Sequence, residues 1–204
     1  MILESGLTGL TIAGSVATLV GLFAAAAAGQ DAALAAEGGR PVSLFDVPVR
    51  TLAAEDTTLG AYRGRVLLIV NVASRCGYTP QYTGLERLHG ELTGSGFKVI
   101  GFPCNQFGAQ EPGTDAEIRD FCSTRYDVSF PLASKLEVNG AERHPLYQWL
   151  TDPAQGFPGD VEWNFEKFLI GRGGRVIARY PSGTRPDDKG LLADIADALE
   201  AVGD

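Results

Sequence analysis

The fold of this chain is decided by residues 66–77, which read VLLIVNVASRCG. The first seven residues are almost entirely branched aliphatic side chains with no polar alternation, and such a run predicts a central β-strand that is buried on both faces. Cys76 follows the end of this strand. Because binding and catalytic groups in open α/β sheets gather at the carboxyl ends of the strands, Cys76 is the first candidate for a functional residue.

Helical and strand patterns alternate after this cysteine. Apolar residues recur every three or four positions between Pro80 and Leu92, which predicts an amphipathic helix with Thr79 as its cap and Pro80 at its first position. Residues 97–102 predict a second buried strand. A second helix is expected from Thr114 to Arg125, because Thr114 and Glu117 have the spacing of a capping box.

Shorter elements flank this pattern. Residues 44–52 have strand character and residues 56–62 predict a short strand or turn that leads into a helical turn, so a small β-hairpin is expected at the start of the domain. The remaining expected elements are a strand at 136–138 before an Asn-Gly turn, a helix at 145–150, strands at 167–170 and 176–180, and a helix at 187–201. This order predicts a thioredoxin-like α/β fold, with a central mixed β-sheet flanked by helices and an N-terminal β-hairpin.

Composition limits the number of domains and the classes of partner. A chain of 204 residues, 45% of them hydrophobic, can bury one substantial core, and we assign that core to a single domain over residues 41–204. The formal net charge is −8 and the chain has no run of Lys or Arg, which excludes the electrostatic footprint of a nucleic-acid-binding protein.

Residues 1–40 differ in kind from the rest and are expected to be an apolar leader and linker. The stretch from Gly6 to Ala28 is long enough to span a membrane, and the small residues near Ala28 and at 33–36 suit signal-peptide cleavage. We therefore expect export or anchoring in an extracytoplasmic compartment, with possible membrane association through residues 7–28. Against this, no basic residue precedes Arg40, so a misassigned start or a plain extension of a cytoplasmic protein stays open.

The cysteines and histidines point to thiol chemistry and away from a metal site. The three cysteines, Cys76, Cys104 and Cys122, match neither a CxxC zinc site nor a dense disulfide scaffold. Both histidines, His89 and His144, fall in expected helical surroundings and are more typical of surface or capping residues than of ligands.

Cys76 lies where its thiolate form would be favoured. A thiol just before a helix meets unpaired backbone N–H groups and the positive end of the helix dipole. A helix terminus alone contributes only about 0.3–1 kcal/mol, so further donors are needed. Neutral candidates occur in residues 105–110 and at Trp163 and Asn164, although each of these taken singly is more typical of a turn or of the core.

Three separate blocks carry a resemblance to a known family. Residues 71–79 (NVASRCGYT), 102–113 (FPCNQFGAQEPG) and 163–169 (WNFEKFL) resemble, in the same order, the three signatures of the glutathione peroxidase family. The resemblance implies that Cys76, in place of the family's selenocysteine, attacks a hydroperoxide. It also implies that Gln110, Trp163 and Asn164 complete a tetrad around the thiolate, with no cofactor.

A second thiol would resolve the sulfenic acid formed on Cys76. Residues 121–126 (FCSTRY) resemble the resolving segment of the thioredoxin-dependent members, which implies a disulfide between Cys76 and Cys122. Thioredoxin or a similar dithiol would then be the reductant, and glutathione a poorer one. The alternative is that Cys122 is only a buried thiol with no role in catalysis, which is what we expect for Cys104. Two thiols on separate helices would also require local unwinding around Cys122.

Two further points are the other functions that these residues allow and the oligomeric state. A peroxide sensor that relays oxidation to a partner protein would share every residue named above, whereas a noncatalytic interaction module would not need the tetrad. The short connection between Asn139 and Trp163 lacks the insertion of tetrameric family members, so we expect a monomer.

Overall fold

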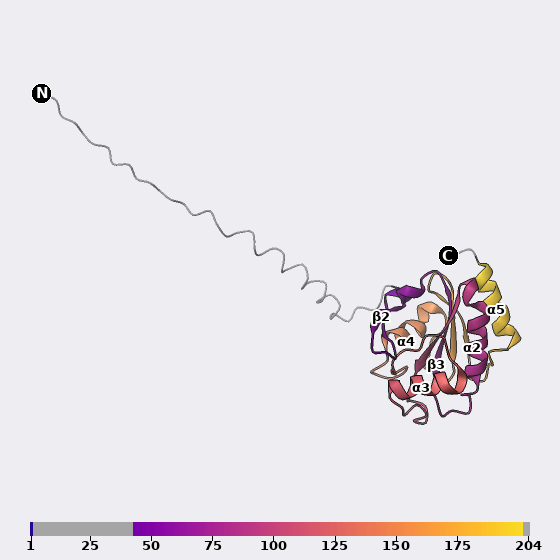
Figure 1. Ribbon diagram of the computed structural model, residues 1–204. Helices are drawn as coiled ribbons and strands as arrows, with labels where there is room; N and C mark the ends of the chain where they lie inside the picture. The colour runs from indigo at the N-terminus through magenta and orange to yellow at the C-terminus, as the bar shows by residue number, and fades with distance from the viewer. Residues whose placement is uncertain (2–42, 202–204) are drawn as a thin grey trace. The chain divides into compact units, whose positions relative to one another are not determined.

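The computed structural model describes residue 1 and residues 43–201. A four-stranded sheet occupies the centre of the domain (Figure 1). Its strands are β3 (Val66–Val72), β4 (Phe97–Pro103), β5 (Lys167–Ile170) and β6 (Val176–Tyr180), in the order β4-β3-β5-β6. Strand β4 is parallel to β3, whereas β5 is antiparallel to both β3 and β6. The predicted mixed sheet and thioredoxin-like order are confirmed.

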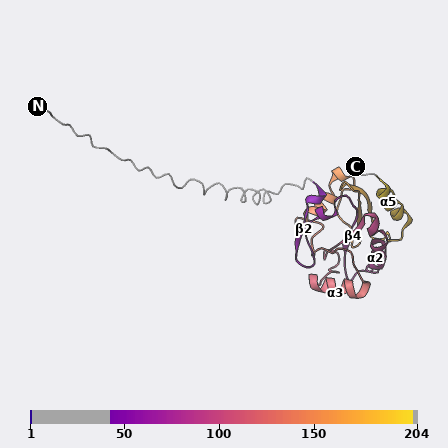
Figure 2. The ribbon, with the colours of Figure 1, turned by 45° about the horizontal axis from the view of Figure 1, so that its top comes forward.

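The sheet is covered on both faces, which is why every residue of β3 is buried. On one face, Leu68 and Val70 pack in a cluster with helices α2 (Gln81–Leu92), α3 (Asp115–Tyr126) and α5 (Lys189–Glu200). On the other, Leu67 and Ile69 pack in a cluster with α4 (Pro145–Leu150). In both views α2 and α5 lie together on one side of the sheet (Figures 1 and 2).

The helix starts follow from their capping groups. Helix α3 begins with the predicted capping box: the Glu117 backbone N–H donates to the Thr114 hydroxyl, and the Thr114 N–H donates to the Glu117 carboxylate. Helix α5 begins two residues later than expected because the Asp188 carboxylate accepts hydrogen bonds from the N–H groups of its first turn. Helix α2 begins at Gln81, and Thr79 does not cap it. Thr79 is instead part of the turn that holds Cys76.

The N-terminal hairpin is confirmed but is shorter than predicted. Strands β1 (Pro48–Arg50) and β2 (Asp56–Thr58) pair antiparallel, and a 3-10 turn, η2 (Leu59–Tyr62), follows. The strand expected over 44–52 is wrong at its start. Residues Leu44–Asp46 form a 3-10 turn, η1, because the Ser43 hydroxyl accepts a hydrogen bond from the Phe45 N–H. Two further 3-10 turns are η3 (Thr93–Ser95) and η4 (Pro153–Gln155).

The strand expected at 136–138 is also wrong, because the chain contacts the sheet a few residues earlier. Leu132 forms an isolated parallel bridge with Gly101. A Cβ atom at Gly101 would lie 2.5 Å from the end of the Leu132 side chain, so any larger residue at this position would force that side chain to move. Residues 136–138 are then held as a loop, with the Val138 N–H donating to the Gln106 side chain.

The expected leader lies mostly outside the described residues. Among the residues that the structure describes, no helix is long and apolar enough to cross a membrane.

Candidate active site

Cys76 occupies a tight turn between the end of β3 and the start of α2. Its backbone N–H donates to the Thr79 hydroxyl at 2.9 Å, and that hydroxyl donates to the Ala73 carbonyl at 2.8 Å. The Tyr78 N–H donates to the Cys76 sulfur at 3.4 Å. Cys76 is 9% exposed, so the sulfur lies at the edge of the core and receives a backbone donor. The roles of Thr79 and Tyr78 were not predicted, although a threonine three residues after the cysteine is a recognisable turn signal.

Gln110 is brought to this turn by an unusual backbone conformation. Gly108 and Ala109 both have left-handed φ angles, of 63° and 52°. The Gln110 carbonyl then accepts a hydrogen bond from the Arg75 N–H at 3.0 Å, directly before Cys76. The block at 102–113 is therefore joined to the Cys76 turn through its main chain.

Residues 163–166, which directly precede β5, contact the Gln110 segment. Asn164 is fully buried, and its side-chain amide donates to the Gln110 side-chain oxygen at 2.9 Å. Trp163 is 40% exposed, and its ring packs at a tilt against Phe107, with 5.7 Å between centroids. The structure thus brings the Gln110 and Asn164 side chains into hydrogen-bond contact, and Trp163 directly precedes Asn164 in the chain.

The corner that carries Trp163 and Asn164 is held by two residues that the sequence did not single out. Phe165 has a left-handed φ of 65°. The Asn71 amide donates to the Trp163 carbonyl at 2.9 Å, and the Lys167 ammonium donates to the Phe165 carbonyl at 2.6 Å. Lys167 is fully buried, and burial lowers its pKa to about 7 despite the opposing effect of Glu166. The sequence did contain a signal for this support, because Asn71 and Lys167 are polar residues within strands that are otherwise apolar.

The tetrad side chains do not hydrogen-bond the sulfur directly. Within residues 43–201, the hydrogen bond that the Cys76 sulfur accepts comes from the Tyr78 N–H, and Gln110, Trp163 and Asn164 form none with it. The Asn164 side-chain oxygen is buried without a hydrogen-bond partner in the same part of the chain. Catalytic hydrogen bonds commonly tighten only when substrate is bound, so the donor role of these side chains stays a prediction.

The three cysteines are all free thiols, and two of them share one face of the sheet. Cys76 and Cys122 belong to the same core cluster, whereas Cys104 lies in the cluster on the opposite face. Cys122 is 1% exposed on α3, and burial, with a contribution from the Glu111 charge, raises its pKa to about 11 against a lowering by the Tyr82 hydroxyl. Burial also raises the pKa of Cys104.

Both histidines serve the fold. The His144 ring accepts a hydrogen bond from the Leu146 N–H and so caps α4, and the His89 ring accepts one from the Val99 N–H.

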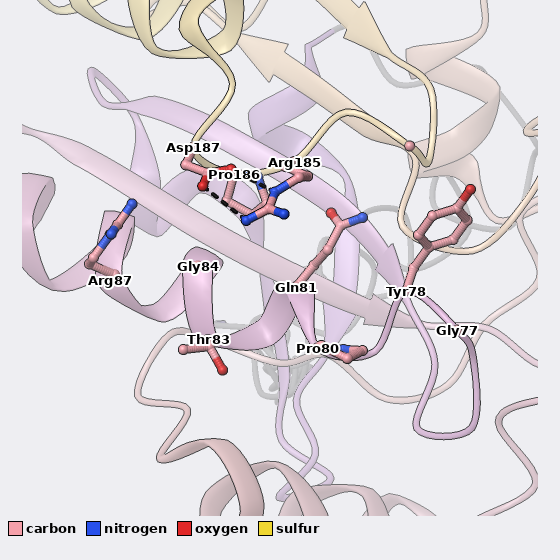
Figure 3. A pocket seen from close by; sticks show the side chains of 11 residues that line it. Gly77, Tyr78, Pro80, Gln81, Thr83, Gly84, Arg87, Arg185, Pro186 and Asp187 are labelled. Atoms are coloured by element: carbon pink, nitrogen blue, oxygen red, sulfur yellow. Dashed lines mark hydrogen bonds and ion pairs between the residues drawn. The ribbon is translucent and has the colours of Figure 1, made fainter.

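A pocket of about 540 Å³ opens beside the Cys76 turn (Figure 3). Gly77 and Tyr78 line one end and Arg87 lines the other, with the first turns of α2 between them. The opposite wall is the segment 183–187, where Arg185 and Asp187 form an ion pair. A Cβ atom at Gly84 would lie 2.9 Å from the Pro186 Cβ, so glycine allows this wall to approach α2 closely.

Comparison with known proteins shows the family of this chain. The model of the glutathione peroxidase family matches residues 44–151, a segment that contains Cys76, Gln110 and Cys122. A hydroperoxy fatty acid reductase of Synechocystis is 48% identical over 164 residues, which cover 77% of this chain and 96% of the relative. The chain belongs to the glutathione peroxidase family. It is a glutathione peroxidase-like hydroperoxide reductase.

Other relatives agree with this assignment. The thioredoxin/glutathione peroxidase BtuE of Escherichia coli is 46% identical over 178 residues, which cover 77% of this chain and 97% of the relative. The crystal structure of Trgpx in its apo form is 40% identical, with a TM-score of 0.63, and the match covers 78% of this chain and 97% of that one. The glutathione peroxidase fold therefore extends beyond the matched segment to the strands and the helix that follow it.

Proposed function

We propose that this glutathione peroxidase reduces hydroperoxides through a sulfenic acid on Cys76. The thiolate attacks the terminal oxygen of the hydroperoxide, a sulfur–oxygen bond forms and the oxygen–oxygen bond breaks. The departing alkoxide or hydroxide takes up a proton and leaves as alcohol or water. The observation that carries this proposal is the position of Cys76, at the carboxyl end of β3 and before α2, with the main chain of Gln110 bonded to the residue that precedes it.

Neutral donors around Cys76 support the same step. The Tyr78 N–H already points at the sulfur, and the start of α2 adds the positive end of a helix dipole. We assign to Gln110, Trp163 and Asn164 the stabilisation of the thiolate and of the charge that develops on the departing oxygen. Amide and indole groups suit this role because they donate hydrogen bonds without titrating.

Replacement of Trp163 by phenylalanine tests the donor role. Phenylalanine keeps a ring against Phe107 but removes the indole N–H, so kcat/KM for hydroperoxide is expected to fall about 10- to 100-fold. Steady-state peroxidase kinetics measure this fall. Trp149→Phe is the matched control, because Trp149 packs with the cluster on the opposite face of the sheet and should leave the rate unchanged. Equal rates for the two variants would contradict the role of Trp163.

We assign the second step to Cys122. Its sulfur attacks the sulfenic sulfur of Cys76, a disulfide forms, the sulfur–oxygen bond breaks, and water leaves. With a pKa of about 11, Cys122 is a protonated thiol at neutral pH and does not compete for the hydroperoxide.

The end of α3 offers a way for Cys122 to reach Cys76. The Cys122 carbonyl accepts hydrogen bonds from the N–H groups of Asp127 and Val128, and Asp127 has a left-handed φ of 52°. The helix thus ends on a non-glycine residue in the left-handed region, which makes this last turn the part of α3 that we expect to unwind first. Its local unwinding should appear as faster amide exchange of residues 122–128 in the oxidised protein, and equal exchange in both redox states would count against it.

The reductant and the substrate follow from the site and its relatives. A disulfide suits a dithiol donor such as thioredoxin, in agreement with the name of the Escherichia coli relative, thioredoxin/glutathione peroxidase BtuE. If residues 1–40 act as a leader, an extracytoplasmic thioredoxin-like protein would take that role. The pocket beside Tyr78 can hold the organic group of a hydroperoxide, in agreement with the name of the Synechocystis relative.

A peroxidase assay with two reductants and two substrates tests this function. We expect turnover with thioredoxin and thioredoxin reductase to exceed turnover with glutathione, and a fatty acid hydroperoxide to have a lower KM than hydrogen peroxide. Faster turnover with glutathione would contradict the dithiol cycle. An equal KM for both substrates would contradict the role of the pocket.

A further inference from the structure

A second cavity lies between the segments that carry the two reactive cysteines. It has a volume of about 210 Å³. Ser74 and Arg75, which directly precede Cys76, line one side, and Ile118 and Phe121 of α3 line another. Phe121 directly precedes Cys122. The cavity is therefore lined by the residue that precedes each partner of the proposed disulfide, and Glu111 is the buried ionisable residue in its wall.

Glu111 is held in place but is only partly satisfied. It is 1% exposed, and its backbone N–H donates to the Asn105 side chain at 2.8 Å. One carboxylate oxygen accepts a hydrogen bond from the Ser74 hydroxyl at 3.1 Å. The other oxygen is buried and has no hydrogen-bond partner within the part of the chain that the structure describes. A buried carboxylate oxygen without a donor carries a substantial desolvation cost, which a purely structural role does not explain.

The electrostatic surroundings link this carboxylate to the resolving thiol. Burial raises the pKa of Glu111, against the lowering by the hydrogen bonds from Ser74 and by the charges of Lys135 and Arg75. In return, the Glu111 charge raises the pKa of Cys122. The Glu111 charge also contributes to the raised pKa values of Tyr82 and Cys104, and Arg75 and Glu117 line the same cavity.

We propose that Glu111 carries the proton of the resolution step, an inference that rests on the proposed Cys76–Cys122 cycle. The Glu111 carboxylate accepts the proton of the Cys122 thiol as that thiol approaches. The resulting thiolate attacks the sulfenic sulfur of Cys76, the disulfide forms, and the sulfur–oxygen bond breaks. The departing hydroxide takes the proton from Glu111 and leaves as water. The carboxylate is regenerated, and no further reactant is consumed.

This role separates the two chemical steps of the cycle. The attack of Cys76 on a hydroperoxide does not require Glu111. The attack of Cys122 does, because a thiol with a pKa of about 11 needs a base to become nucleophilic at neutral pH. A carboxyl group whose pKa is raised is a better proton acceptor than an exposed one.

Stopped-flow single turnovers of Glu111→Gln test the proposal. Formation of the sulfenic acid is expected at the wild-type rate, and formation of the Cys76–Cys122 disulfide is expected to be at least about 100-fold slower. Glu117→Gln is the matched control. Glu117 lines the same cavity but is exposed and engaged in the capping box of α3, so both rates should be unchanged.

The pH dependence adds a second readout. In the wild type, the rate of disulfide formation should rise with pH as Glu111 ionises, because only the carboxylate accepts a proton. The Gln variant should lack this rise. Glu111→Asp keeps the charge on a shorter side chain and should resolve at an intermediate rate, which tests the role even if the Gln variant folds poorly.

Three results would overturn the proposal. They are an unchanged disulfide rate in Glu111→Gln, equal slowing of both steps, and equal disulfide rates in the Asp and Gln variants. A wild-type protein that forms no Cys76–Cys122 disulfide would instead remove the proposed cycle on which the inference rests.

Discussion

Replacement of Cys76 by serine is expected to lower kcat/KM for hydroperoxides by at least about three orders of magnitude. Serine preserves the size of the side chain and can still accept the hydrogen bond from the Tyr78 N–H. It does not ionise at neutral pH and cannot form a sulfenic acid, so the first step of the cycle is lost. A coupled assay that follows consumption of hydroperoxide measures this effect.

The control for this variant is Cys104→Ala. Cys104 is fully buried on the opposite face of the sheet, so this change should leave peroxidase activity near the wild-type value while lowering stability slightly. Residual turnover in Cys76→Ser that depends on Cys104 would show that the wrong sulfur has been assigned as the nucleophile.

Replacement of Cys122 by serine is expected to separate the two steps. The first turnover, in which one equivalent of hydroperoxide oxidises Cys76, should proceed at the wild-type rate because Cys122 takes no part in it. Steady-state turnover with thioredoxin should fall at least about 100-fold, because the sulfenic acid has no partner thiol with which to condense. Rapid mixing followed by quenching measures the first turnover, and a coupled assay with thioredoxin measures the steady-state rate.

This variant also has a clear contrary outcome. Full turnover of Cys122→Ser with thioredoxin would show that the reductant attacks the sulfenic acid directly, and the two-cysteine cycle would be wrong. The Glu111 inference would then be wrong as well.

The centre of the fold was predictable because its signals are local. The strand predicted at 66–72 has these bounds in the structure, since a continuous aliphatic run indicates burial on both faces. The capping box of α3 was read correctly from Thr114 and Glu117. The errors at 44–52 and 136–138 have another origin. Whether these segments pair with a strand depends on the Ser43 cap and on the approach of Leu132 to Gly101, neither of which leaves a periodic pattern.

The sequence predicted which segments form the site, but it did not predict which residues hold those segments in place. The resemblance named Gln110 and Asn164, and the structure places them in hydrogen-bond contact. It did not indicate that Asn71 and Lys167 hold the corner at Phe165, because that support depends on a left-handed backbone conformation in a residue other than glycine. Glu111 was passed over for a similar reason, since its burial arises only when the loop packs against α3.

The most direct test is to identify the sulfur that a hydroperoxide oxidises first. One equivalent of hydroperoxide is added to Cys122→Ser in the presence of dimedone, which labels sulfenic acids, and the labelled peptide is identified by mass spectrometry. We expect the label on Cys76, and in the wild type a disulfide between Cys76 and Cys122 in its place. A label on Cys104, or no label on any cysteine, would contradict the assignment of Cys76 as the nucleophile.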